Sequence, residues 1–252
     1  MRRLFFLIVV ILLYSFCLQR KPVTIYLAGD STMSFFELTR SPLTGWGTPF
    51  STFFDSSVRI INKARGGRSS RTFISENRWQ QIVDSLKKGD YVFIQFGHND
   101  EAREGPMRDR YTSIPDYRKN LVRFILETRK KKAYPVLVTP VTRLVFDSAG
   151  EVPETHPGYY EACIEIAQQY KTPLIDLDKK SRELAKEMGP QAAKLMFLYL
   201  KPGENPHYLE GIEDNTHFTE YGARKLAELV LSGVRELLPN LQQRLFVPND
   251  EE

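Results

Sequence analysis

Three short polar motifs carry residue types that hydrolytic chemistry uses: Gly29-Asp30-Ser31, Gly97-His98-Asn99-Asp100 and Asp214-Asn215-Thr216-His217. A serine hydroxyl becomes a nucleophile when a neighbouring base accepts its proton. His217 can be that base, and Asp214 can orient its imidazole ring. The Asn99 amide can donate to a developing oxyanion, which lowers the barrier by ~3 kcal/mol in comparable sites. Together the three motifs predict a serine hydrolase.

Each motif alone has a simpler explanation. Ser31 could cap a helix, and Asn99 could form an Asx turn. Asp214 could cap a turn, with His217 an ordinary surface histidine. The combination of the motifs and their places along the chain favour catalysis.

Hydrophobic periodicity predicts alternating strands and helices. Five runs rich in β-branched and aromatic residues predict strands at Val23–Ala28, Val58–Asn62, Tyr91–Phe96, Pro135–Thr139 and Pro173–Leu177. Apolar residues at helical spacing predict helices at Asn77–Lys88, Asp116–Lys131, Tyr159–Tyr170, Asp178–Met188 and Glu220–Leu238. This alternation is typical of one α/β domain whose parallel sheet is covered on both faces. Loops that follow the strands then meet at one edge, where Ser31 and Asn99 would lie.

Some connecting segments are longer than such a fold requires. They are Ser31–Asp55, Glu101–Pro115, Thr142–Pro157 and Gly189–Glu213. The first three emerge on the side of the candidate site. Long loops in that position usually shape a binding cleft.

Composition is that of an ordinary globular protein. The chain has 252 residues, of which 42% are hydrophobic and 26% charged, so it can form one domain with a sizeable core. The net charge is +4, and the positive charges are scattered apart from Arg129–Lys132 at the end of a predicted helix. No basic stripe alternates with aromatic residues, so we expect no nucleic-acid partner.

The N-terminus differs from the rest of the chain. Arg2 and Arg3 precede the uncharged run Leu4–Phe16, which is typical of an export signal. We assign residues 1–20 to a signal peptide or a lipoprotein signal or anchor, and residues 21–252 to the hydrolase domain. Ser15-Phe16-Cys17 resembles a lipobox, which leaves lipidation of Cys17, secretion and an uncleaved anchor open. We expect an exported protein that is periplasmic, secreted or attached to a membrane through its N-terminus only.

Several further residues are candidates for the site. Gly67 belongs to a glycine pair that permits positive φ, so its N–H could approach an oxyanion. Arg68 and Arg71 could bind an acidic substrate or tie their loop to carboxylates, and the second role is slightly favoured. We expect His98 to be structural or substrate-contacting, and Asp100 to order its loop.

Aromatic residues could stack on a sugar, but most have a simpler role in packing. The candidates are Trp46, Trp79, Tyr159 and Tyr160. Trp79 in particular falls on the apolar side of its predicted helix. Cys163 also lies at an apolar helical position, so we expect an inert core thiol and no intramolecular disulfide.

The motifs resemble those of the SGNH (GDSL-type) hydrolase superfamily in order and spacing. Longer strings are similar to its rhamnogalacturonan acetylesterase branch, a carbohydrate esterase family: Leu27-Ala28-Gly29-Asp30-Ser31-Thr32, Gly45-Trp46-Gly47, Gly67-Arg68-Ser69-Ser70-Arg71 and Gln95-Phe96-Gly97-His98-Asn99-Asp100. The similarity extends from about Val23 to Leu238. Any one motif is weak, whereas four in order are specific.

The resemblance implies a flavodoxin-like, three-layer α/β/α fold with a five-stranded parallel sheet. It makes Ser31 the nucleophile, His217 the base and Asp214 the residue that orients it. The backbone N–H groups of Ser31 and Gly67 and the Asn99 amide would form the oxyanion hole. The resemblance implies no cofactor and no metal. Trp46, Arg68 and His98 are the candidate substrate contacts.

We therefore expect a serine esterase that removes O-acetyl groups from a plant cell-wall polysaccharide, with acetylated rhamnogalacturonan or pectin favoured. Acetylated xylan, a lipid ester or an aryl ester are alternative substrates. A metallophosphoesterase is a weaker alternative, with Asp30, Asn99, Asp100, Asp214 and His217 as ligands. A non-catalytic carbohydrate-binding protein is weaker too, because a full catalytic set is present. Composition and motifs do not indicate an oligomeric state.

Overall fold

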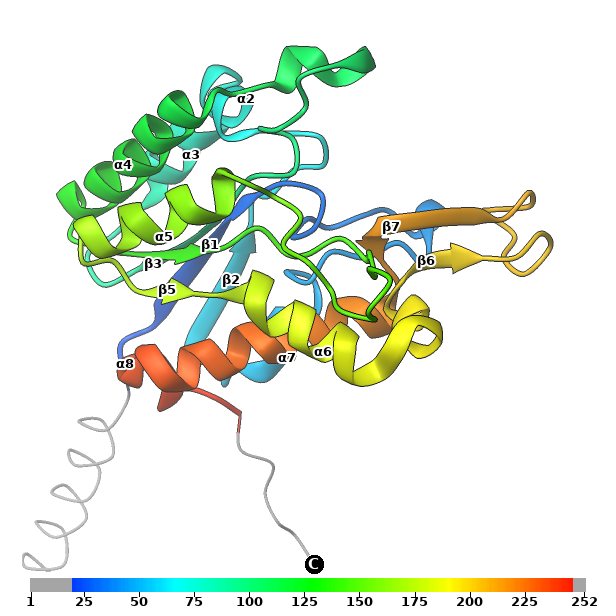
Figure 1. The fold of residues 1–252 in the computed structure, drawn as a ribbon. Coiled ribbons are helices and arrows are strands. Elements are labelled where there is room, and N and C mark those ends of the chain that lie inside the picture. The colour runs from blue at the N-terminus through cyan, green and yellow to red at the C-terminus, as the bar shows by residue number, and fades with distance from the viewer. Residues whose placement is uncertain (1–19, 247–252) are drawn as a thin grey trace, which may run out of the picture.

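A five-stranded parallel sheet forms the centre of the molecule (Figure 1). The computed structural model describes residues 20–246. Its strands are β1 (Val23–Gly29), β2 (Val58–Asn62), β3 (Tyr91–Gln95), β4 (Tyr134–Val138) and β5 (Leu174–Ile175). They pair in parallel in the order β2-β1-β3-β4-β5. All five predicted strands are confirmed, with ends that differ by up to two residues.

Helices cover both faces of the sheet, which confirms the predicted three-layer fold. On one face lie α6 (Leu177–Ala192), α7 (Glu220–Leu237) and the short α8 (Pro239–Gln242). On the other lie α2 (Ser70–Ser75), α3 (Arg78–Ser85), α4 (Ile114–Lys130) and α5 (Tyr159–Gln169). Short 3-10 helices occur at Leu38–Arg40, Pro49–Phe53, Gly105–Arg110 and Ala193–Met196. Figure 1 shows the strands between the two helical layers.

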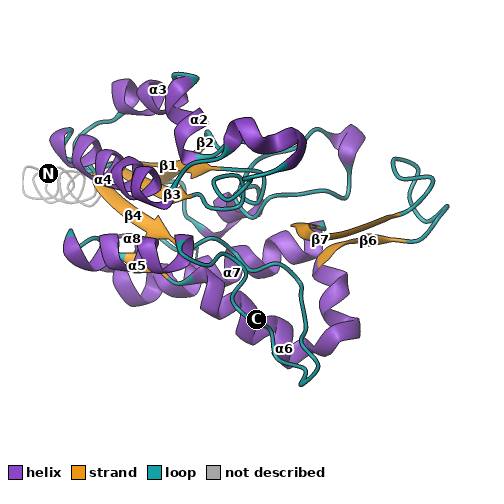
Figure 2. Cartoon of the chain, turned by 45° about the horizontal axis from the view of Figure 1, so that its top comes forward, coloured by secondary structure: helices purple, strands orange, loops and turns teal. Residues whose placement is uncertain are grey.

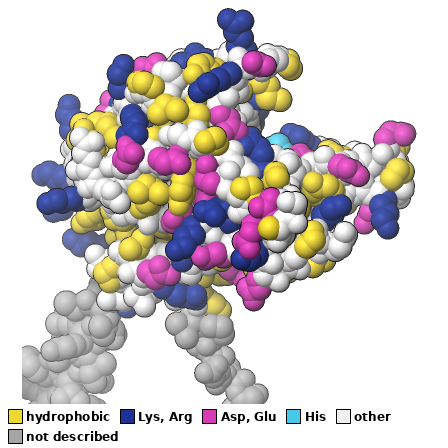
Figure 3. Space-filling view, in the orientation of Figure 1, with side chains coloured by type: hydrophobic (Ala, Val, Ile, Leu, Met, Phe, Trp, Pro, Cys, Tyr) yellow, Lys and Arg dark blue, Asp and Glu magenta, His cyan; other side chains and the backbone are white. Residues whose placement is uncertain are grey.

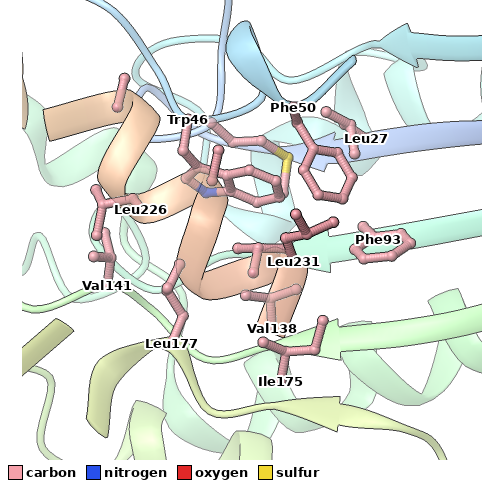
Figure 4. Packing of buried hydrophobic residues seen from close by; sticks show 14 of the residues in the cluster. Leu27, Trp46, Phe50, Phe93, Val138, Val141, Ile175, Leu177, Leu226 and Leu231 are labelled. Atoms are coloured by element: carbon pink, nitrogen blue, oxygen red, sulfur yellow. The ribbon is translucent and has the colours of Figure 1, made fainter. Parts of the chain in front are cut away.

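The alternation of side chains along the strands builds two separate cores. On β1, Ile25 and Leu27 face the core shared with α6 and α7. Tyr26 and Ala28 face the core beneath α3, α4 and α5. Both faces are apolar because helices cover both, as expected for a parallel sheet. Figure 4 shows the first core, in which Trp46 packs among aliphatic and aromatic side chains.

An antiparallel hairpin that the sequence analysis did not predict projects from the body (Figures 1 and 2). It consists of β6 (Phe197–Leu200) and β7 (Ile212–Phe218). The segment Gly189–Glu213 is therefore not a simple connection, because β6 and the first residues of β7 lie within it. Asp214 and His217 lie on β7 itself.

The register of the hairpin is interrupted next to Asp214 and His217. Leu198 pairs with Asp214, whereas the preceding Phe197 pairs with Phe218. Residues 215–217 therefore have no partner on β6 in this register. A bulge of this kind bends the strand and re-aims its side chains.

The N-terminal prediction lies outside the part of the chain that the structure describes. Cys17 and almost all of the proposed signal fall within residues 1–19. Between residues 20 and 246, no helix is both long enough and apolar enough to cross a bilayer. Cys163 is buried in the core, as predicted.

The hairpin is joined to α7 by a close approach at Gly222. Thr219 caps α7, and its hydroxyl donates to the Leu195 carbonyl at 2.8 Å. A Cβ on Gly222 would lie 1.9 Å from the Met196 carbonyl oxygen. Glycine is therefore required where the first turn of α7 meets the chain that enters β6.

We predict that Gly222→Ala destabilises the protein, because the added methyl group forces backbone atoms apart. The expected loss in the free energy of unfolding is about 1–3 kcal/mol, measured by urea denaturation. Arg235→Ala, at an exposed position of the same helix, should change it little. Equal stability of the two variants would contradict the close contact.

Candidate active site

A chain of hydrogen bonds joins Ser31, His217 and Asp214. The Ser31 Oγ lies 2.9 Å from His217 Nε2. His217 Nδ1 lies 2.7 Å from Asp214 Oδ2. Ser31 follows the end of β1, whereas the other two residues lie on β7. The fold thus brings together three residues that the sequence analysis selected from opposite ends of the chain.

The direction of these hydrogen bonds follows from the chemistry of a carboxylate. An ionised carboxylate can only accept, so His217 Nδ1 must carry the proton that lies between it and Asp214. The other nitrogen, Nε2, is then unprotonated and can accept the Ser31 hydroxyl proton. Asp214 therefore selects the tautomer in which the imidazole acts as a base.

The bulge in β7 holds the Asp214 carboxylate in place. Its Oδ1 accepts from the backbone N–H groups of Thr216 at 2.8 Å and His217 at 3.0 Å. Burial acts to raise the pKa of Asp214, but the hydrogen bonds and the charge of His217 outweigh burial and lower the pKa to about 2. Asp214 thus stays ionised throughout the neutral pH range.

A buried polar network supports the turn that carries Ser31. Asp30 Oδ1 accepts from the Thr32 backbone N–H at 2.9 Å and from the Thr32 hydroxyl at 2.8 Å. Gln95, at the end of β3, donates from Nε2 to the Thr139 carbonyl at 3.0 Å. Its Oε1 lies 3.3 Å from the Thr32 hydroxyl. The turn is therefore held from the neighbouring strands rather than by its own backbone alone.

The prediction that Trp46 contacts the substrate is wrong. Its side chain is fully buried, and its Nε1 donates to Gln95 Oε1 at 2.8 Å. Trp46 also stacks edge-on against Phe50, with ring centroids 5.4 Å apart (Figure 4). A ring with no exposed face cannot stack on a sugar, so Trp46 supports the network behind the nucleophile instead.

Three N–H donors are available for an oxyanion. Within residues 20–246, neither the Ser31 nor the Gly67 backbone N–H donates a hydrogen bond to the protein. Gly67 adopts a φ of 78°, which other residues rarely reach. The Asn99 amide donates one hydrogen to the Arg68 carbonyl at 3.2 Å and keeps a second hydrogen free. The role of these groups in catalysis remains a prediction.

Ser31, Asp214 and His217 line a cleft of about 600 Å³. It is lined by Ser31, Ser34, Phe35, Phe36, Glu37, Arg40, Arg65, Gly66, Gly67, Arg68, His98, Asn99, Met107, Arg110, Arg143, Asp214, Thr216 and His217. In Figure 3, histidine and basic side chains gather where the projecting hairpin meets the body. Five arginines against two carboxylates give the lining an excess of positive charge.

The arginines of the cleft differ in how they are paired. Arg68 Nε bonds the Glu76 carboxylate at 3.0 Å, and Arg143 Nη1 bonds that of Glu101 at 2.5 Å. Among the described residues, Arg40, Arg65 and Arg110 have no carboxylate partner. Arg68 thus has the loop-tying role that was favoured, and its contact with substrate remains a prediction.

His98 lies in the wall of the cleft but is nearly buried. Its Nδ1 lies 3.2 Å from Nε2 of His156, a fully buried histidine. Burial lowers the pKa of both histidines, that of His156 to about 3, so the pair is uncharged at neutral pH. This pairing gives His98 a structural role, and contact with substrate remains a prediction for it.

Other predicted residues have structural roles. The Asp100 carboxylate accepts from the Ser70 backbone N–H at 3.0 Å and so orders its loop. Arg71, on α2, donates to the Tyr111 carbonyl at 3.0 Å and so ties this helix to the segment that precedes α4. Trp79 and Tyr159 are buried, as the packing explanation predicted.

The sequence analysis missed several residues of the cleft. These are Phe35, Phe36, Arg40, Arg65, Arg110 and Arg143. Phe35 is 59% exposed and so offers an aromatic surface that Trp46 does not. Phe35 and Phe36 lie in the first long loop, so attention to that loop could have identified them. Isolated arginines carry no motif, and nothing in the sequence singles them out.

The geometry does not favour the metal-site alternative. The carboxylates of Asp30, Asp100 and Asp214 each bond separate neighbouring donors rather than converge. In residues 20–246, one group of His, Asp and Glu side chains is close enough to share an ion: Glu154, His156 and Asp178. That group contains none of the five ligands considered for a metallophosphoesterase.

Comparison with known proteins agrees with the geometry of the site. Residues 27–225 match the model of the GDSL-like Lipase/Acylhydrolase family. Rhamnogalacturonan acetylesterase RhgT of Bacillus subtilis (strain 168) is 40% identical over 235 residues, which cover 93% of this chain and 99% of that protein. The probable rhamnogalacturonan acetylesterase YesY of the same organism is 37% identical over 214 residues, covering 84% and 93% of the two chains.

A solved structure extends the similarity to three dimensions. The crystal structure of YxiM from Bacillus subtilis matches with a TM-score of 0.71 and 26% identity over 86% of this chain. The matched part is 57% of the YxiM chain, so this chain spans little more than half of that neighbour. Sequence, fold and hydrogen-bonded triad agree: the chain belongs to the GDSL-like lipase/acylhydrolase family, the SGNH hydrolases, and is a carboxylic ester hydrolase.

Proposed function

We propose that this esterase removes O-acetyl groups from acetylated rhamnogalacturonan, a pectin polysaccharide. The observation that carries the proposal is the Ser31–His217–Asp214 hydrogen-bond chain at the floor of an arginine-lined cleft. The names of RhgT and YesY, which are similar over most of the chain, support the same substrate.

The first half of the reaction transfers the acetyl group to the enzyme. His217 Nε2 accepts the hydroxyl proton as Ser31 Oγ attacks the acetyl carbonyl. The carbonyl oxygen becomes an oxyanion, to which the backbone N–H groups of Ser31 and Gly67 and the side-chain amide of Asn99 donate hydrogen bonds. The bond between the acetyl carbon and the sugar oxygen then breaks. The imidazolium gives its proton to this oxygen, which leaves as a sugar hydroxyl. The product is acetyl-Ser31.

The second half releases acetate and restores the enzyme. The same imidazole, neutral again, accepts a proton from water, whose oxygen attacks the acetyl-serine carbonyl. Collapse of this second oxyanion breaks the ester, and the proton passes back to Ser31 Oγ. Asp214 stays a carboxylate throughout and stabilises the imidazolium that forms in each half.

The charge of the cleft supports an acidic polysaccharide over a neutral one. Galacturonate units carry a carboxylate each, and guanidinium groups bind carboxylates through paired N–H donors. Arg40 and Arg65 are exposed in the cleft and lack carboxylate partners among the described residues. An acetylated xylan has a mainly neutral backbone and would gain less from them.

We also propose that the protein is exported and meets its substrate outside the cytoplasm. The basic residues Arg2 and Arg3 followed by the apolar run Leu4–Phe16 support export. A polymer too large to enter a cell requires an enzyme outside it. Identification of the mature N-terminus by mass spectrometry tests this, and a mature protein that begins at Met1 would contradict a cleaved signal.

Ser31→Ala should abolish acetate release from acetylated pectin, because the Ser31 hydroxyl is the one bonded to the base His217 among residues 20–246. We expect a loss in kcat of about 10⁵- to 10⁶-fold, with an unchanged circular dichroism spectrum. Acetate release is measured by an enzyme-coupled assay. A folded variant that retains activity would require a different nucleophile.

Asp214→Asn should lower kcat by about 10³- to 10⁴-fold, because an amide N–H directed at the His217 ring selects the tautomer with a protonated Nε2.

The free energy of unfolding should also depend on pH through Asp214. The folded pKa of Asp214, about 2, lies below the ordinary 3.8, so its contribution is present above pH 4 and is lost as pH falls towards 2. Urea denaturation between pH 2 and 6 should show a smaller loss of stability on acidification in the variant.

Arg65→Ala should weaken binding of the acidic polysaccharide without affecting the chemistry. We expect KM for acetylated rhamnogalacturonan oligosaccharides to rise roughly two- to fivefold, with kcat and activity on 4-nitrophenyl acetate unchanged. Added salt should diminish the difference. Arg59→Ala, at an exposed position outside the cleft, removes the same charge and should have no effect. Equal effects of the two variants would argue against an arginine contact with substrate.

A further inference from the structure

One guanidinium group in the cleft touches two residues of the predicted oxyanion hole. Arg110 ends the 3-10 helix Gly105–Arg110, and its side chain lines the cleft. Its Nη1 donates to Asn99 Oδ1 at 3.3 Å. Its Cζ lies 3.1 Å from the position that a Cβ on Gly67 would occupy. The group therefore lies over Gly67 and against the Asn99 amide.

The hydrogen bonds of Asn99 set the orientation of its amide. A guanidinium can only donate, so it must face the oxygen Oδ1. The Arg68 carbonyl can only accept, so it must face the nitrogen Nδ2, which lies 3.2 Å away. A flipped amide would place two donors against each other on one side and two acceptors on the other. Arg110 and the Arg68 carbonyl thus select one orientation together.

This orientation determines what the amide offers to substrate. One Nδ2 hydrogen is used on the Arg68 carbonyl, and the second remains free at the wall of the cleft. A donor aimed before the reaction starts stabilises the oxyanion without reorganisation at the moment of attack. An amide that rotates freely would lose part of that advantage.

The missing side chain of Gly67 leaves room for the Arg110 guanidinium. Gly67 has a φ of 78°, and a side chain there would meet Cζ, Nη1 and Nη2 of Arg110 at 3.1–3.2 Å. A Cβ would therefore displace the guanidinium as well as strain the backbone. The absence of a side chain leaves the face of Gly67 open to Arg110.

We propose that Arg110 is a positioning residue of the esterase, which holds the Asn99 amide so that its free N–H is directed at the oxyanion. The inference rests on the proposed catalytic role of the oxyanion hole. Arg110 has no carboxylate partner among residues 20–246, so its positive charge is not neutralised by a neighbouring side chain and is available to the cleft.

Two other roles are separable from this one. If Arg110 only anchors a carboxylate of the polysaccharide, its loss changes KM for acidic substrates and leaves an uncharged ester unaffected. If Arg110 only stabilises its helix, its loss lowers the melting temperature and acts independently of Asn99. A positioning role instead lowers kcat for an uncharged ester, and only while Asn99 is present.

The test is a double-mutant cycle on 4-nitrophenyl acetate, whose acyl group is the natural one and which carries no charge. Arg110→Met should lower kcat about tenfold with KM within about twofold of the parent value, and Arg110→Lys should recover part of the loss. Asn99→Ala should lower kcat about 10²- to 10³-fold. In the Asn99→Ala background, Arg110→Met should cause no further loss.

Arg108→Met, on the same 3-10 helix but outside the cleft, is the matched control and should retain full activity. Melting temperatures show whether each variant is folded. If Arg110→Met and Asn99→Ala act additively, or if only KM changes, the proposal is overturned. Activity retained by Ser31→Ala would instead overturn the proposed mechanism, so the two failures are distinguishable.

Discussion

The hydrogen bond between Ser31 and His217 joins residues 186 positions apart, and the rest of the site depends on it. A proton transfers only across hydrogen-bond distance, so a displacement of about 1 Å between the sheet and the hairpin would impair catalysis. β1 fixes the position of the hydroxyl. The β7 bulge and α7 fix the position of the imidazole. The core beneath α7, which contains residues of β1, β7 and α7 itself, therefore also maintains the catalytic geometry.

Behind Ser31, buried polar groups fix the conformation of the turn more precisely than apolar contacts could. Thr32 donates to Asp30, and Gln95, whose Oε1 lies near the Thr32 hydroxyl, donates to the Thr139 carbonyl just after β4, which defines one conformation for the turn. Trp46 adds its indole N–H to this network while its ring fills the apolar core. Buried hydrogen bonds of this kind are directional, so they select a single arrangement where hydrophobic contacts would tolerate several.

The charges in the cleft have complementary roles. Asp214 is an anion held at low pKa behind the imidazole, where it stabilises the positive charge that catalysis creates. The arginines across the cleft supply positive charge. The pair His98 and His156 contributes no charge at neutral pH, because burial lowers the pKa of both. The electrostatic field that meets a substrate therefore comes mainly from guanidinium groups.

Hydrophobic periodicity and short motifs are local properties, so they predicted the five parallel strands, five of the helices that cover them and the residues of the triad. The short helices α2 and α8 were not predicted. The positions of less regular residues emerge only in the folded chain. The hairpin β6–β7 escaped prediction because its strands pair across a long turn and are interrupted by a bulge. Trp46 proved to be buried, whereas Phe35 is exposed, because burial depends on what packs against a residue. Arg110 reaches Asn99 through contacts that no spacing encodes, since they form only when separate loops meet.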